Sequence, residues 1–216
     1  MFSLGFRGHL MQNKIFLVDL DETLIKYNSF PRWIFFILYR SLLELNFEVL
    51  FNILHISILR KLRVYNHNIY KMKLMEIEFP DAWNVDFAKV INSKIRLDVV
   101  NLVEEVCKKS SCYAVVSSAA PINYIRHIDV PSDFFINACM GSFISDGGEL
   151  FNNIGFNKYE QASVLKNNEV LGIFTDHYLD FSAIREGKIF VINPNSSTSK
   201  YIIDNNVDCD VFIFKE

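Results

Sequence analysis

Hydrophobic residues form five short runs, one near the start of the chain and four after residue 111. The runs are rich in β-branched and aromatic residues, and they span 14–20, 112–118, 134–140, 169–175 and 188–194. Near-continuous apolar runs are typical of parallel strands whose two faces are both covered by helices. Helical patterns lie after the strands, over 97–109, 121–128, 157–167, 178–186 and 196–206. The alternation predicts an α/β fold: a Rossmann-like, doubly wound parallel sheet with right-handed crossovers.

Two segments depart from this alternation. Residues 143–151, "FISDGGELF", place Asp-Gly-Gly between two strand-like arms and therefore predict a β-hairpin. Residues 27–95 are a long helical block between the first and second core strands. Because the block interrupts the core, we expect it to be an inserted α-helical cap over the carboxyl ends of the strands.

The longest apolar region of the chain begins at Trp33, inside this block. Arg40, Glu44 and Glu48 interrupt it, so no run of about 18 uncharged apolar residues is available to span a bilayer. We interpret the region as a pair of amphipathic helices packed on the rest of the protein. Contact with a membrane surface is the alternative interpretation.

Composition and charge narrow the class of protein. The chain has 216 residues, of which 50% are hydrophobic and 14% aromatic, so it can bury a sizeable core. The formal net charge is −3 and the isoelectric point is about 6.0. Nothing in the sequence resembles the basic face with which a protein binds nucleic acid, and no nucleic-acid partner is expected.

The cysteines indicate a reducing compartment. Four cysteines occur without a C-x-x-C pair and without histidines at zinc-ligand spacing, so we expect reduced thiols in a cytoplasmic protein. The first 14 residues lack the sustained apolar run of a secretory signal. Met11 is an alternative to Met1 as the natural start.

Polar residues that suit phosphate chemistry follow the predicted strands. In open α/β sheets, ligands bind beyond the carboxyl ends of the strands, where the strand order reverses. Several carboxylates, a hydroxyl and an ammonium would meet there, a set that suits Mg²⁺ and a substrate phosphate. A cation would also offset the repulsion between neighbouring carboxylates. The residues are Asp19, Asp21, Ser117, Ser118, Lys158, Asp176 and Asp180.

Four motifs in this order resemble those of the haloacid dehalogenase (HAD) superfamily of phosphatases. They are "FLVDLDETL", "VVSSAAP", "GFNK" and "IFTDHYLDF". The resemblance covers nearly the whole chain and is to the phosphoserine phosphatase-like branch, which has a helical cap after the first motif. It implies a catalytic core of residues 11–26 and 96–216 and a helical cap of residues 27–95.

The resemblance implies an enzyme that hydrolyses a small phosphomonoester with Mg²⁺ through an aspartyl-phosphate. Asp19 would be the nucleophile, and Asp21 would protonate the leaving oxygen and then activate water. The metal would be bound by the Asp19 carboxylate, the Asp21 main-chain carbonyl and the Asp176 carboxylate. Two alternatives stay open: a phosphotransferase or mutase, and a non-catalytic protein that binds a membrane or a partner.

The remaining motif residues have implied supporting roles. Ser118 and Lys158 would hold the transferring phosphoryl oxygens, with Ser117 as the alternative to Ser118. Asp180 would support the metal's waters or orient Lys158, and Thr23 would steady the loop that carries Asp21. Position 22 is Glu where many members have Gly, and its side chain is expected to point away from the site.

Overall fold

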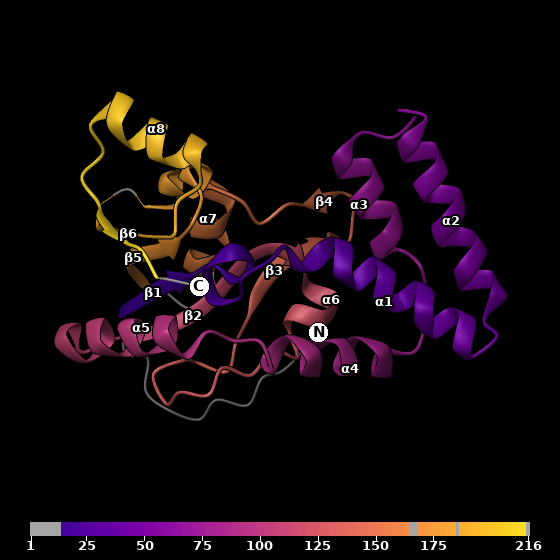
Figure 1. Ribbon diagram of the computed structural model, residues 1–216, viewed down its shortest axis with the longest axis horizontal. Helices are drawn as coiled ribbons and strands as arrows, with labels where there is room; N and C mark the ends of the chain where they lie inside the picture. Colours follow the sequence, from indigo (N-terminus) through magenta and orange to yellow (C-terminus); the bar gives the residue numbers. More distant parts are fainter. Residues whose placement is uncertain (1–13, 165–167, 185, 215–216) are drawn as a thin grey trace.

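The fold is a seven-stranded sheet flanked by helices, seen in a computed structural model that describes residues 14–164, 168–184 and 186–214 (Figure 1). The strand order is β4-β3-β2-β1-β5-β6-β7. Only β3 and β4 pair antiparallel, as the predicted hairpin, and the other neighbours are parallel. The predicted doubly wound α/β fold is confirmed, since the chain builds outward from β1 in both directions. The strands are β1 (Lys14–Val18), β2 (Tyr113–Pro121), β3 (Met140–Ile144), β4 (Leu150–Phe151), β5 (Glu169–Thr175), β6 (Lys188–Ile192) and β7 (Asp210–Phe212).

Both faces of the sheet are buried, which explains why the central strands are apolar at successive positions. Phe16 and Val18 of β1 share one hydrophobic cluster with α5 (Leu97–Ser110). Ile15 and Leu17 share a second cluster with residues of α7 (Phe156–Val164) and the 3-10 helix η2 (Tyr178–Ala183). Because side chains alternate between the two faces of a strand, a strand that is buried on both faces is apolar at successive positions.

The block between β1 and β2 is helical, as predicted. After the turn η1 (Leu20–Leu24) come α1 (Ser29–Leu43), α2 (Phe47–Lys61), α3 (His67–Met75) and α4 (Asp81–Asn92). The side chains of Asn28, Asn46 and Asn66 accept hydrogen bonds from the first turns of α1, α2 and α3 and fix where these helices begin. No helix of the described residues is long and apolar enough to cross a membrane.

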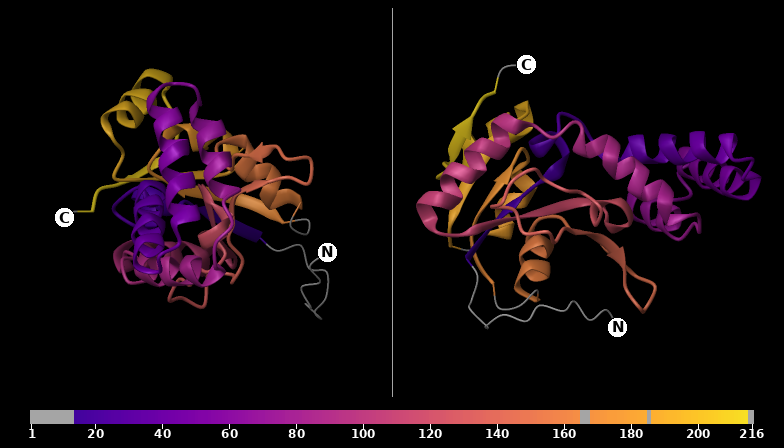
Figure 2. Two further views of the ribbon diagram at one scale, coloured as in Figure 1. Left: turned by 90° about the vertical axis from the view of Figure 1, so that its right-hand side faces the viewer. Right: turned by 90° about the horizontal axis from the view of Figure 1, so that it is seen from below.

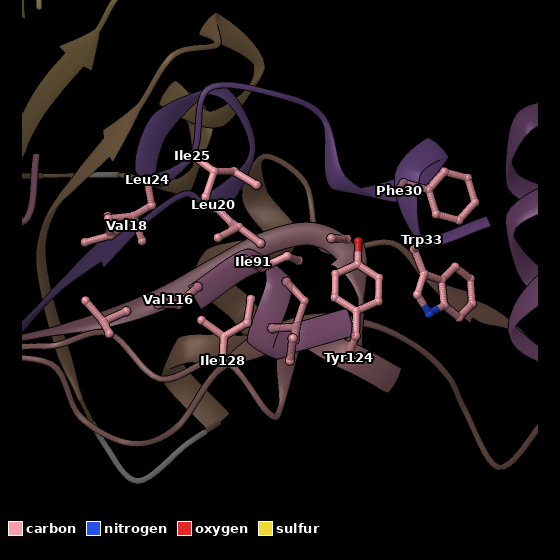
Figure 3. Packing of buried hydrophobic residues seen from close by; sticks show 14 of the residues in the cluster. Val18, Leu20, Leu24, Ile25, Phe30, Trp33, Ile91, Val116, Tyr124 and Ile128 are labelled. Carbon is pink, nitrogen blue, oxygen red and sulfur yellow. The ribbon is translucent and has the colours of Figure 1, made fainter. Parts of the chain in front are cut away.

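The helical block packs against the sheet through aromatic side chains. Trp33 of α1 and Tyr124 of α6 (Ile122–Ile125) are buried side by side, with ring centroids 5.6 Å apart (Figure 3). Phe30 and Trp33 are both part of this core. The division of the chain into a core and a cap at residues 26/27 and 95/96 stays a prediction. Residues 11–13 and both candidate starts, Met1 and Met11, lie outside the described residues.

The strand predicted over 134–140 is wrong. Only Phe135 forms an isolated bridge, with Ala114, and β3 begins at Met140. At Gly141 the main chains of β3 and β2 lie close together, because a Cβ there would lie 2.9 Å from the Ala120 carbonyl oxygen. Two predicted helices are also shorter than expected, since 122–125 alone is α-helical in 121–128 and 178–183 forms the 3-10 helix. A final helix, α8 (Ser196–Asn205), follows β6 and agrees with the prediction for 196–206.

Candidate active site

A cavity of about 210 Å³ opens where the strand order reverses, beyond the carboxyl ends of β1 and β5. Asp19 follows β1 directly, and Asp176 follows β5. The main chain ties these two ends together, since the Asp19 amide donates to the Phe174 carbonyl at 2.9 Å. The lining residues are Asp19, Asp21, Glu22, Asn28, Ala119, Ile154, Lys158, Asp176, His177 and Asp180.

Lys158 joins two of the predicted carboxylates inside this cavity. Its Nζ donates to Asp19 Oδ1 at 2.7 Å and to Asp180 Oδ2 at 2.6 Å, and the lysine is 1% exposed. Burial alone would lower the pKa of Lys158, but the charges and hydrogen bonds of Asp180 and Asp19 outweigh it and raise the pKa. The side chain is therefore a fixed ammonium that faces the predicted nucleophile.

Asp180 holds this ammonium in place. Its Oδ2 also accepts from Thr175 Oγ1 at 2.9 Å, and its Oδ1 accepts from the Gly155 amide at 3.0 Å. Gly155 has φ +56°, and a Cβ there would lie 2.9 Å from the Leu179 carbonyl oxygen, so only glycine fits at the start of α7. Of the two supporting roles expected for Asp180, orienting Lys158 is the one that its contacts favour.

Asp21 is positioned by the first turn of α1. The Ser29 amide donates to Asp21 Oδ1 at 2.9 Å, and Ser29 Oγ shares a 2.7 Å hydrogen bond with the Tyr124 hydroxyl. Burial raises the pKa of Asp21 to about 6, although the hydrogen bonds from Ser29 oppose the shift. A carboxyl group with a pKa near neutrality is suited to donate and accept a proton in one catalytic cycle.

The donors beside Asp19 fit a hard divalent cation. The Asp176 carboxylate is 6% exposed and has no ion-pair partner in the described part of the chain. Burial raises its pKa to about 8, and the charges of Asp19 and Glu22 add to the shift, which a cation would reverse. Within the described residues, no group of three His, Cys, Asp or Glu side chains could hold a metal ion. Mg²⁺ commonly uses only one or two carboxylates with water and a substrate phosphate, so Asp19, Asp176 and the Asp21 carbonyl fit it.

The second-motif serines lie beside the cavity and do not line it. Ser118 is 1% exposed and its Oγ accepts from the Ala120 amide at 3.2 Å. Ser117 Oγ accepts from Asn153 Nδ2 at 3.1 Å. The neighbouring Ala119 is the residue of this segment that lines the cavity. The choice between the two serines therefore stays a prediction.

Thr23 and Glu22 belong to the first motif. Thr23 is fully buried, and its Oγ1 has no hydrogen-bond partner within the described residues, so its role in steadying the loop stays a prediction. The Thr23 carbonyl accepts from Arg96 Nη1 at 3.4 Å. Glu22 lines the cavity rather than pointing away, and its φ of +60° is in the left-handed region. That backbone conformation explains why glycine is common at this position of the motif.

One buried charged residue of the helical block, Lys71, was not predicted from the sequence. Lys71 of α3 is 3% exposed, and its Nζ donates to Ser142 Oγ at 2.8 Å, to Asn152 Oδ1 at 2.7 Å and to the Ala119 carbonyl. It therefore joins α3 to the segment that borders the cavity. No sequence signal distinguishes it from Lys73, two residues later, which is on the surface and pairs with Glu76 at 2.7 Å.

Comparisons with known proteins support the fold. No protein-family model matches the chain, and no curated protein matches it significantly. A solved protein of unknown function from Bordetella pertussis Tohama I is 12% identical, with 92% of this chain and 98% of that one covered and a TM-score of 0.63. Cytosolic 5'-nucleotidase IIIB bound to cytidine is 15% identical, with 93% and 80% covered and a TM-score of 0.55. A HAD family hydrolase from Salmonella enterica serovar Typhi is 13% identical, with 87% and 65% covered and a TM-score of 0.48. The first two likenesses show that the chain shares their α/β fold.

Proposed function

We propose that this chain is a Mg²⁺-dependent phosphatase of the HAD type, which hydrolyses a small phosphomonoester through an aspartyl-phosphate. The observation that carries the proposal is the Asp19–Lys158–Asp180 arrangement at the switch point of the sheet, in one cavity with Asp21 and Asp176. A buried ammonium beside a carboxylate nucleophile places positive charge where the phosphoryl oxygens must lie.

Asp19 and Asp21 divide the chemistry between them. A carboxylate oxygen of Asp19 attacks phosphorus, the bond from phosphorus to the leaving oxygen breaks, and Asp21 gives that oxygen its proton. In the second step water attacks phosphorus, Asp21 takes the proton from this water, and the bond between phosphorus and Asp19 breaks. Asp19 is thereby restored as a carboxylate, and the products are an alcohol and inorganic phosphate.

The remaining residues bind and orient the phosphoryl group. Lys158 neutralises its oxygens, and Asp180 keeps the ammonium pointing toward Asp19. Ser118 or Ser117 would supply a hydrogen bond from the end of β2. Asp19, Asp176 and the Asp21 carbonyl would hold Mg²⁺, which supplies Lewis-acid stabilisation of charge on the phosphoryl oxygens when bound. Residues 27–95 would act as the cap that limits which leaving groups and how much water enter.

A screen of small phosphomonoesters with Mg²⁺ tests the proposal. We expect phosphate release from at least one ester, its loss on chelation and its recovery with added Mg²⁺. Asp19→Asn should reduce turnover by roughly 10³-fold or more, and Asp21→Asn by about 10²–10⁴-fold. Asp146→Asn, an exposed carboxylate in the β3–β4 turn, is the matched control and should leave turnover unchanged.

Product analysis separates hydrolysis from transfer. In the presence of a competing alcohol, a hydrolase releases inorganic phosphate, whereas a phosphotransferase yields a new phosphoester. Wild-type protein that releases no phosphate from any ester, or Asp19→Asn and Asp21→Asn variants that match its rate, would refute the assigned roles.

A further inference from the structure

Helix α2 has two apolar faces, and only one of them is covered. Val49 and Ile53 are each 2% exposed and pack toward α1 and α3. On the other face, large apolar residues recur at helical spacing and are 42–66% exposed: Phe47, Phe51, Leu54, Ile58 and Leu62. A surface helix normally carries one apolar stripe that faces the core, so the second stripe is not explained by folding.

Exposed large apolar side chains also occur on α1 and in the turn between the helices. Eleven of the 21 exposed large apolar side chains of the described residues lie between residues 35 and 64. Phe35, Tyr39, Leu42, Leu43 and Leu45 belong to α1 and to this turn. We name residues 29–64 the α1–α2 hairpin. Exposed apolar side chains in this number on neighbouring elements are typical of surfaces that bind a partner or a membrane.

The charge of the hairpin indicates which kind of surface it binds. The hairpin, residues 29–64, carries five Lys or Arg residues and two Glu residues, Glu44 and Glu48, so its formal net charge is +3, whereas that of the whole chain is −3. Arg60, Lys61 and Arg63 are exposed at the end of α2, interleaved with Leu62, and have no ion-pair partner within the described residues. Exposed cations beside an apolar stripe complement anionic lipid headgroups above acyl chains.

The hairpin lies at one end of the molecule. Helices α1 and α2 project away from the sheet, and α2 is the helix farthest from α8 (Figures 1 and 2). A second copy of the chain is the alternative occupant of this face.

We propose that the α1–α2 hairpin docks on an anionic lipid bilayer. The stripe of α2 would lie among the outer parts of the acyl chains, with Lys61 and Arg63 at the headgroups, while Val49 and Ile53 stay packed on the protein. The proposal does not depend on the catalytic function, because binding is measured without substrate.

Flotation of the full-length chain with lipid vesicles tests the proposal. We expect binding to vesicles of phosphatidylcholine mixed with phosphatidylglycerol, little binding to phosphatidylcholine alone, and weaker binding as salt is raised. Lys61→Gln with Arg63→Gln should weaken binding about tenfold or more. Arg60 is left unchanged, since its guanidinium also donates to the Tyr65 carbonyl.

A second variant tests the apolar stripe. Phe51→Gln with Ile58→Gln removes two side chains that are 64% and 55% exposed, so the fold should survive, and binding should fall about tenfold or more. Lys200→Gln with Ile203→Gln on α8 is the matched control and should bind as wild type. All variants should keep the wild-type melting temperature.

Three results would overturn the proposal: no flotation of wild-type protein with anionic vesicles, equal binding by the wild type and both hairpin variants, or equal loss in the α8 control. A wild-type dimer that the Phe51 and Ile58 changes convert to monomer, without vesicle binding, would assign the face to self-association instead.

Discussion

Two buried lysines, Lys158 and Lys71, show how differently one fold can treat the same side chain. Both are at most 3% exposed. Lys158 contacts two carboxylates, Asp19 and Asp180, whereas Lys71 contacts only neutral oxygens, among them Ser142 Oγ and Asn152 Oδ1. Lys158 is on α7, beside the sheet, and Lys71 is on α3 of the helical block.

The two sets of partners move the pKa values in opposite directions. Contact with two carboxylates raises the pKa of Lys158 despite its burial. Burial lowers the pKa of Lys71 to about 8, and the charge of Asp21 opposes this shift only in part. The comparison indicates that Lys158 is held as a permanent charge, which agrees with the phosphate binding that we propose for it. Lys71 instead joins α3 to the sheet and can lose its proton.

Replacing Lys158 should have the largest effect. Lys158→Met leaves Asp19 and Asp180 buried without a counter-charge, so we expect the free energy of unfolding to fall by about 3–5 kcal/mol. Turnover should fall by about 10²–10³-fold, as for loss of one group that stabilises charge in the transition state. Denaturant unfolding and steady-state kinetics measure the two losses.

The Lys158 result can be separated from a simple packing defect. Adding Asp180→Asn to Lys158→Met removes one of the unpaired charges and should recover part of the stability without recovering turnover. A double variant that is no more stable than Lys158→Met would contradict the electrostatic explanation.

Replacing Lys71 should have a smaller effect. Lys71→Met leaves neutral acceptors without their donor and no carboxylate without a partner, so we expect a loss of about 1–3 kcal/mol in the free energy of unfolding. Turnover should fall much less than in Lys158→Met, because Lys71 does not line the cavity. A loss of stability as large as that of Lys158→Met would remove the distinction between the two lysines. Lys73→Met, an exposed neighbour on the same helix, serves as the control.

The pH dependence of the free energy of unfolding should show the smallest effect, and it tests directly whether the pKa of Lys71 is lowered. The pKa of Lys71 is about 8 in the folded protein and near 10.5 when unfolded, so above pH 8 the unfolded chain binds the extra proton. Wild-type stability should therefore rise relative to Lys71→Met by about 1 kcal/mol between about pH 7.5 and 9. Paired unfolding curves at both pH values measure the difference. A constant or falling difference would contradict the lowered pKa.

Features of the fold and the candidate site that are set by a few neighbouring residues could be predicted from the sequence. The apolar run that leads into Asp19 and Asp21 predicts both a buried strand and the candidate catalytic residues at its end, because one short segment of the sequence carries both patterns. The contact of Lys158 with Asp180 follows from motif order in a doubly wound sheet.

Features that depend on tertiary packing could not be read in this way. The run at 134–140 is apolar because Phe134 and Phe135 pack on the core from a loop, and the sequence does not distinguish this from a strand. Likewise, α2 has two apolar faces, and only the fold determines that Val49 is covered and Phe51 is not.

The most direct test of the central claim is to trap the phosphorylated enzyme. Wild-type protein turning over a radiolabelled phosphomonoester with Mg²⁺ is quenched in acid, and its peptides are mapped for label. We predict label on the peptide that contains Asp19, more label in Asp21→Asn because the second step is slowed, and none in Asp19→Asn. Turnover without protein-bound label in both the wild type and Asp21→Asn, or label on a different residue, would contradict Asp19 as the group that accepts phosphorus.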